Sequence, residues 1–172
     1  MCILEDHKSN TVKKQKISFE LTVYKNKEEL SVEERKLMHI AVKARNKAYA
    51  PYSNFNVGAA VLLENGEVVI GNNQENAAYP SGLCAERVAV FYAGAKYPGV
   101  KIKSIAITAA SKKYKVETPV PPCGSCRQSL SEYENKQKEP IMLFLMGENG
   151  EVLKCNSISD ILPLAFNKSF LG

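Results

Sequence analysis

The spacing of apolar residues changes along the chain between a strand-like and a helical period. Residues 17–24 (ISFELTVY) alternate apolar and polar side chains, which is typical of a β-strand. After Ser31, two acidic residues begin a stretch in which apolar residues recur at helical spacing until Pro51. This pattern predicts a first helix between Ser31 and Pro51.

Two later segments share a hairpin pattern. Residues 61–71 (VLLENGEVVIG) and 143–155 (LFLMGENGEVLKC) each contain Asn-Gly between apolar runs, the strongest short-range hairpin signal. Between them the pattern predicts helices at 84–96 and 123–136 and a buried strand at 105–110, and a short helix is expected at the end of the chain. This alternation predicts a layered α/β domain whose hydrophobic sheet is covered on both faces.

The length of 172 residues fits one domain, and a hydrophobic fraction of 45% excludes a wholly disordered chain. We expect residues 1–28 to form a partly disordered N-terminal extension that adds one edge strand, and residues 29–172 to form the main folded domain. The net charge of +5 is spread along the chain and predicts no nucleic-acid partner. The polar start and the strand-sized apolar runs predict no export and no membrane partner, so we expect a soluble, cytoplasmic protein.

Five cysteines, an odd number, favour thiol or metal chemistry over a disulfide framework. Cys123 and Cys126 form a Cys-x-x-Cys pair at the start of a predicted helix, where free N–H groups and the helix dipole favour thiolates. This pair alone is ambiguous between redox chemistry, a structural zinc site and a catalytic one.

A third cysteine, Cys84, also begins a predicted helix and has Glu86 two positions later. Three cysteines beside a carboxylate match a catalytic zinc site, which keeps three protein ligands and one open position. The alternative is a structural four-cysteine site closed by Cys155, but no second Cys-x-x-Cys accompanies that residue, and packing in a hairpin arm is its expected role. Cys2 is expected to be free, and neither His7 nor His39 is a favoured ligand.

Several motifs resemble the cytidine deaminases of the three-cysteine, homotetrameric type. They are Cys-Ala-Glu at 84–86, PCGSCRQ at 122–128, APYSNF at 50–55, NxENAAY at 73–79 and LPLAF at 162–166, so the resemblance spans residues 30–167. It implies a three-layer α/β/α domain of the cytidine-deaminase type with a central mixed five-stranded sheet. It also implies one Zn²⁺ per subunit and a homotetramer.

In this family zinc makes a bound water acidic, and a glutamate moves protons during attack on C4 of cytosine. The resemblance therefore implies that Cys84, Cys123 and Cys126 are the metal ligands and that Glu86 is the catalytic acid and base. Three thiolates leave a net negative site, so we expect Arg87 and Arg127 to offset the charge by donating to sulfur, with Gln128 beside them.

The resemblance also implies the substrate contacts. Asn73 and Glu75 would bond the ribose, Phe55 would stack on the pyrimidine, and backbone groups at Ala85 and Pro122 would bond the base and the leaving ammonia. Tyr79 and Phe166 match positions that relatives contribute to a neighbouring subunit's pocket.

The predicted reaction is the zinc-dependent hydrolysis of cytidine and deoxycytidine to uridine and deoxyuridine with release of ammonia, as in pyrimidine salvage. The expected partners are the nucleoside and water. The same zinc chemistry would also serve a related aminonucleoside such as blasticidin S. From other classes, the alternatives are a nonenzymatic structural-zinc module and a redox protein.

Overall fold

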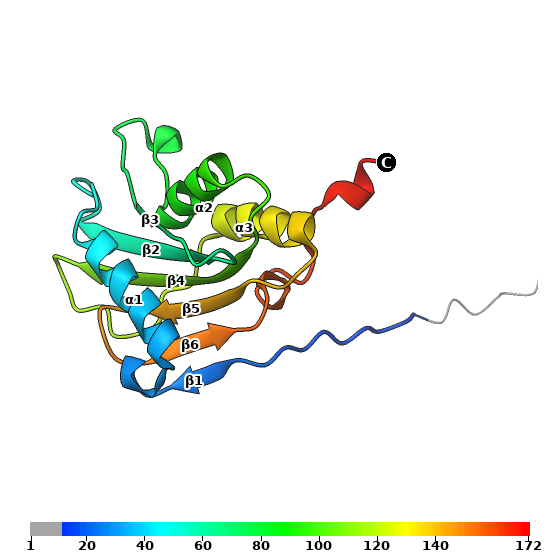
Figure 1. Ribbon diagram of the computed structural model, residues 1–172, viewed down its shortest axis with the longest axis horizontal. Coiled ribbons are helices and arrows are strands. Elements are labelled where there is room, and N and C mark those ends of the chain that lie inside the picture. The colour runs from blue at the N-terminus through cyan, green and yellow to red at the C-terminus, as the bar shows by residue number, and fades with distance from the viewer. Residues whose placement is uncertain (1–11) are drawn as a thin grey trace, which may run out of the picture.

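The computed structural model describes residues 12–172, and a mixed sheet forms its centre (Figure 1). The strands are β1 (Thr22–Tyr24), β2 (Phe55–Leu63), β3 (Val68–Asn72), β4 (Ile102–Ser111), β5 (Met142–Met146) and β6 (Val152–Cys155). The helices are α1 (Val32–Arg45), α2 (Ala85–Lys96) and α3 (Gly124–Gln137). Single 3₁₀ turns lie at Lys27–Glu29, Tyr79–Ser81, Ile158–Asp160 and Lys168–Phe170.

The strand order is β1-β6-β5-β4-β2-β3, and β4 and β5 form the parallel pair. The five strands that we expected are joined by a sixth, because Thr22–Tyr24 pairs antiparallel with β6, placing Tyr24 opposite Val152. The sheet therefore has six strands and not the five expected for the central sheet, and the added one is an edge strand within residues 17–24, where the alternating pattern predicted a strand. The α/β fold class is confirmed.

Helices cover both faces of the sheet, as the alternation of residues along β2 requires. Ala60 and Leu62 pack on one face with residues of α1 such as Met38. Val61 and Leu63 point to the opposite face, where α2 and α3 lie side by side (Figure 1). The result is the three-layer arrangement, with the starts of α2 and α3 on the same side of the sheet.

Both hairpins form at their Asn-Gly turns, where Gly66 and Gly150 adopt left-handed backbone angles (φ of 86° and 88°). A capping box fixes the start of α1: the Ser31 side chain accepts from Glu34 N, and the Glu34 carboxylate accepts from Ser31 N. The Asn-Gly turns and the start of α1 are therefore determined by interactions between residues that are close in the sequence.

None of the helices within residues 12–172 is sufficiently long and apolar to cross a membrane. Partial disorder of the N-terminal extension stays a prediction. Residues 1–11 of this extension, which include Cys2 and His7, lie outside the described residues.

Gly71 of β3 allows α2 to approach the sheet closely. A Cβ atom at Gly71 would overlap the backbone of α2, meeting Ala89 N at 2.6 Å and the Ala85 carbonyl oxygen at shorter range. Because backbone atoms cannot yield as a flexible side chain can, Gly71→Ala should lower the free energy of unfolding by about 3 kcal/mol. Chemical denaturation measures this loss.

The matched control is Gly124→Ala at the start of α3. A Cβ atom there meets nothing within 4 Å, so the free energy of unfolding should stay within about 1 kcal/mol of the wild-type value. Equal losses in the two variants would contradict the close approach of α2 to β3.

Candidate metal centre and pocket

Three sulfur atoms meet where α2 and α3 begin. Cys84 and Cys123 are the N-cap residues of these helices and make no side-chain capping bond, so both sulfur atoms belong to residues at the positive ends of helix dipoles. Cys126, in the first turn of α3, is fully buried. The Sγ atoms of Cys84 and Cys123 lie 3.9 Å apart, and all three sulfur atoms lie within 4.8 Å of one another.

This donor set fits zinc. Two thiolates bound tetrahedrally at about 2.3 Å from zinc are about 3.8 Å apart, close to the distance between Cys84 and Cys123. Cys155 is not a member of the three-sulfur group and is buried in the core at the end of β6. Burial raises the pKa of Cys155 to about 11, as in a packing residue.

The charges around the sulfur atoms favour an ionised Cys84. A hydrogen bond from Cys126, the largest contribution, and the Arg87 guanidinium together lower the pKa of Cys84 to about 5. The pKa of Cys126 is raised, because Cys126 keeps its proton for that hydrogen bond and is buried. A divalent cation among the three sulfur atoms would favour the thiolate form of each.

Glu86 lies in the first turn of α2 and is only 4% exposed. Its Oε2 atom is buried and has no hydrogen-bond partner among the described residues. Burial, together with the charge of Cys84, raises the pKa of Glu86 to about 7. A carboxyl group that titrates near neutral pH and has an unused oxygen is suited to general acid and base chemistry.

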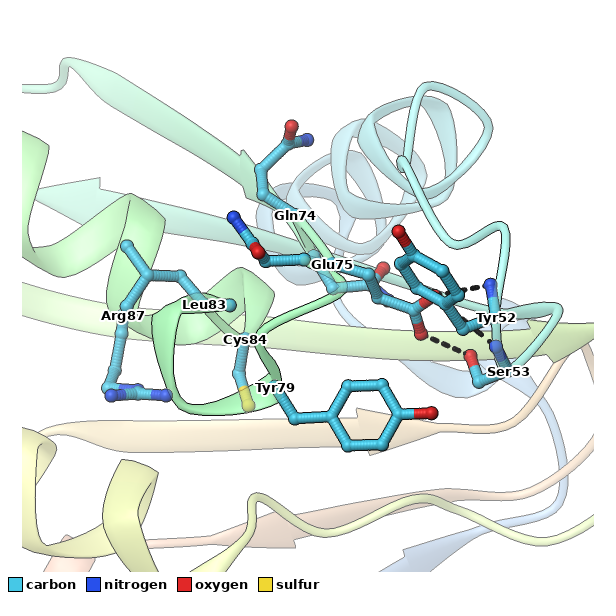
Figure 2. Close-up of a pocket in the computed structure, with 11 residues that line it drawn as sticks. Tyr52, Ser53, Gln74, Glu75, Tyr79, Leu83, Cys84 and Arg87 are labelled. Atoms are coloured by element: carbon cyan, nitrogen blue, oxygen red, sulfur yellow. Dashed lines mark hydrogen bonds between the residues drawn. The ribbon is translucent and has the colours of Figure 1, made fainter.

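A cavity of about 500 Å³ opens beside Cys84 and Arg87 (Figure 2). It extends to Asn73, Glu75 and Tyr79, three residues that the sequence motifs singled out. The sulfur atom of Cys84 and the carboxylate of Glu75 lie apart from each other along this lining (Figure 2).

Glu75 is held by the loop that precedes β2. Its Oε2 accepts hydrogen bonds from the backbone N–H groups of Tyr52 (2.9 Å) and Ser53 (3.3 Å), and its Oε1 accepts one from the Ser53 hydroxyl. Partial burial raises the pKa of Glu75, but these hydrogen bonds outweigh it and the net shift is downward. Glu75 is therefore a carboxylate at neutral pH.

Asn73 is bonded to β2. Its Nδ2 donates to the Phe55 carbonyl at 2.9 Å, and its Oδ1 accepts from Val57 N at 2.8 Å. One N–H of the amide remains for a ligand in the cavity. Asn73 thus lines the cavity and also holds the start of β2, where Phe55 lies.

Comparisons with known proteins match this geometry. Residues 31–139 match the family described as "Cytidine and deoxycytidylate deaminase zinc-binding region". The chain belongs to this family.

Curated relatives and solved structures agree with the assignment. The chain is 40% identical to a cytidine deaminase of Halalkalibacterium halodurans (76% of this chain, 91% of the relative) and 41% identical to one of Sporosarcina psychrophila (80% and 93%). The crystal structure of cytidine deaminase from Burkholderia pseudomallei superposes with a TM-score of 0.68 at 40% identity and covers 80% of this chain and 100% of that one. The family, the class of hydrolytic deaminase and the zinc cofactor are thereby confirmed.

The two arginines after the metal-site motifs differ in what they contact. Arg87 contributes to the low pKa of Cys84 by hydrogen bonding and by its charge. Arg127, which we expected to donate to sulfur, instead donates to the carbonyl oxygens of Pro122 (2.8 Å) and Ile161 (3.1 Å). Its guanidinium therefore ties the segment before Cys123 to the C-terminal region.

Of the remaining candidate residues, Tyr79 lines the cavity, whereas Phe55, Ala85, Pro122 and Phe166 do not. Ala85 is fully buried behind Cys84, and Phe55 is partly buried at the start of β2. Tyr79 is 76% exposed and packs edge-on against Tyr52, with ring centroids 6.1 Å apart. Phe166 is 56% exposed, and Gln128 donates to its carbonyl oxygen at 2.7 Å. Within the one chain, Phe166 does not line the cavity.

Tyr52 and Ser53 were not predicted as site residues, although both line the cavity and bond Glu75. They stand inside the APYSNF motif, between Pro51 and Phe55. The motif was therefore the available signal, but the pairing of this loop with Glu75 is visible only in three dimensions.

Proposed function

We propose that this chain hydrolyses cytidine and deoxycytidine to uridine and deoxyuridine, with release of ammonia. The observation that carries the proposal is the group of three cysteine sulfur atoms next to a buried glutamate with an unpartnered oxygen. Membership of the deaminase family supports the same reaction, as do relatives called cytidine deaminase.

Cys84, Cys123 and Cys126 would hold the zinc ion. When bound there, zinc supplies a Lewis acid that makes water nucleophilic at neutral pH. Glu86 accepts a proton from this water as the oxygen adds to C4 of the cytosine ring, and it delivers that proton to ring N3. Glu86 then moves the remaining proton of the new hydroxyl to the amino group, the C4–N4 bond breaks, and ammonia leaves. Water is the only co-substrate.

The part of the cavity away from Cys84 would hold the sugar. Asn73 and Glu75 would bond ribose hydroxyls, which would leave the base beside Cys84. We assign stacking on the pyrimidine to Phe55, and bonds to the base and the leaving ammonia to backbone groups of Ala85 and Pro122. Gln128 and Arg127 would fix the segments on which Pro122 and Phe166 lie.

Arg87 would tune the metal site by offsetting the charge of Cys84. Because the charge of Arg87 lowers the pKa of Glu86, the proposed proton acceptor, Arg87→Ala should raise this pKa and move the acidic limb of the pH profile to higher pH. We expect kcat to fall by about tenfold. The pH dependence of kcat/KM and the zinc content measure both effects, and Arg87→Lys, which keeps a charge, should be less affected. An unchanged profile in an Arg87→Ala enzyme with full zinc content would refute this role.

A homotetramer with shared pockets is part of the proposal. Tyr79 and Phe166 are exposed in the single chain, which supports a place for them against a neighbouring copy. Light scattering should give a mass near four times 19.0 kDa, and an active monomer would contradict shared pockets. We further propose a cytoplasmic location and a role in pyrimidine salvage, since free thiols suit a reducing compartment.

The direct test is to incubate the purified protein with cytidine and to follow the ultraviolet change and the release of ammonia. Equal amounts of uridine and ammonia are expected, with deoxycytidine converted as well. A protein that turned over blasticidin S but neither nucleoside would refute the proposed substrate.

A further inference from the structure

The hydroxyl group of Ser53 connects two parts of the proposed substrate site. Its oxygen accepts a hydrogen bond from Phe55 N at 3.0 Å, and its hydrogen is donated to Glu75 Oε1. Because a lone pair of the oxygen faces the Phe55 N–H group, the hydroxyl hydrogen is directed toward the carboxylate. The orientation of this hydroxyl is thus set by the backbone at the start of β2.

The hydrogen bonds of Glu75 leave little acceptor capacity for a ligand. A carboxylate has about four acceptor sites, and three of them are used by Tyr52 N, Ser53 N and the Ser53 hydroxyl. Two of these donors share Oε2, so the open site is on Oε1, the oxygen that Ser53 also bonds. Since Glu75 is ionised, its remaining partner must be a donor such as a sugar hydroxyl.

The loop that carries Ser53 is anchored at both ends. Asn54 has a left-handed backbone (φ of 58°), a conformation that asparagine tolerates better than most residues. Its N–H donates to the Ala50 carbonyl at 3.1 Å, and its carbonyl accepts from Lys112 N, just beyond β4, at 3.0 Å. On the other side, the Tyr49 carbonyl accepts from Glu75 N at 2.9 Å. The loop is therefore a fixed support for the carboxylate.

We propose that Ser53 is a positioning residue that holds Glu75 Oε1 toward the cavity and so sets the enzyme's preference for a hydroxylated sugar. This inference rests on the proposed function, because it assigns Glu75 to the sugar. Ser53 acts through Glu75 and leaves the chemistry at C4 unchanged. Ser53 therefore contributes to the binding of cytidine, and it makes no such contribution for a nucleoside whose sugar has no hydroxyl at positions 2′ and 3′.

The test compares cytidine with 2′,3′-dideoxycytidine in wild-type, Ser53→Ala and Ser53→Thr enzymes. Hydrogen bonds to charged groups are strong enough that Ser53→Ala should lower kcat/KM for cytidine by about tenfold, chiefly through a higher KM. The value for dideoxycytidine should change by less than about twofold, because the lost group supported only the sugar contact. Ser53→Thr keeps the hydroxyl and should restore cytidine turnover to within about threefold of wild type.

A double-mutant cycle separates this role from general damage to the loop. If Ser53 acts through Glu75, then adding Ser53→Ala to Glu75→Gln should cost little beyond the loss from Glu75→Gln alone. Additive losses, equal losses for the two nucleosides, or no loss for cytidine would each overturn the proposal. Thermal unfolding and zinc content confirm that the variants are folded.

The outcomes also distinguish this inference from the proposed function. A wild-type enzyme that deaminated neither nucleoside would overturn both. A wild-type enzyme that deaminated cytidine, together with equal losses for both nucleosides in Ser53→Ala, would overturn the role of Ser53 alone.

Discussion

Replacing Glu86 by glutamine is expected to lower kcat/KM for cytidine by about 10⁴-fold, while the protein keeps its zinc. Glutamine has nearly the shape of glutamate but cannot accept and return a proton, so the variant removes the proton carrier and leaves the three sulfur atoms in place. The side chain is buried with one unused oxygen, so its replacement should not disturb other hydrogen bonds of the fold. Steady-state kinetics and metal analysis measure the two results.

The control for this variant is Glu33→Gln, which changes an exposed glutamate in the first turn of α1. It should retain kcat/KM within about twofold, because surface changes of this kind have small effects. If Glu86→Gln were as active as Glu33→Gln, the assignment of Glu86 to proton transfer would be wrong, and the structural-zinc module would be favoured.

The second large effect is expected at Cys126. Cys126→Ser should abolish both zinc binding and turnover, because serine is a poor zinc ligand and the sulfur atom lies in the group of three. Loss of a ligand that binds only the folded chain should also lower the free energy of unfolding by about 3 kcal/mol or more. Metal analysis and chemical denaturation in the presence and absence of a chelator measure these changes.

Cys155→Ala is the matched control, since Cys155 is equally buried but lies outside the three-sulfur group. It should keep one zinc ion per chain and most of the activity, with a loss of stability of about 1 kcal/mol from the small cavity. Zinc retained in Cys126→Ser but lost in Cys155→Ala would contradict the assignment of ligands.

The elements around the metal centre could be predicted from the sequence because their signals are local. Asn-Gly turns, the start signal at Ser31 and the apolar periods indicated the hairpins and helices. The cysteines at two predicted helix starts also indicated a metal site. In the structure these cysteines meet because both helices pack on one face of the sheet and begin on the same side.

The features that escaped prediction depend on contacts between distant segments. Of the edge strand that we expected within residues 17–24, only Thr22–Tyr24 forms, because only these residues pair with β6. The guanidinium of Arg127 bonds Ile161, 34 residues away, where sequence alone suggested a sulfur partner. Ser53 and Glu75 likewise stand 22 positions apart and meet only after β2 and β3 pair.

The central claim is that three cysteine sulfur atoms hold a zinc ion that keeps one position open for solvent. Zinc K-edge X-ray absorption of the purified protein counts the sulfur neighbours directly. We expect three sulfur neighbours at about 2.3 Å and one lighter neighbour. Four sulfur neighbours, or a protein purified without zinc that gains no activity when zinc is added, would contradict it.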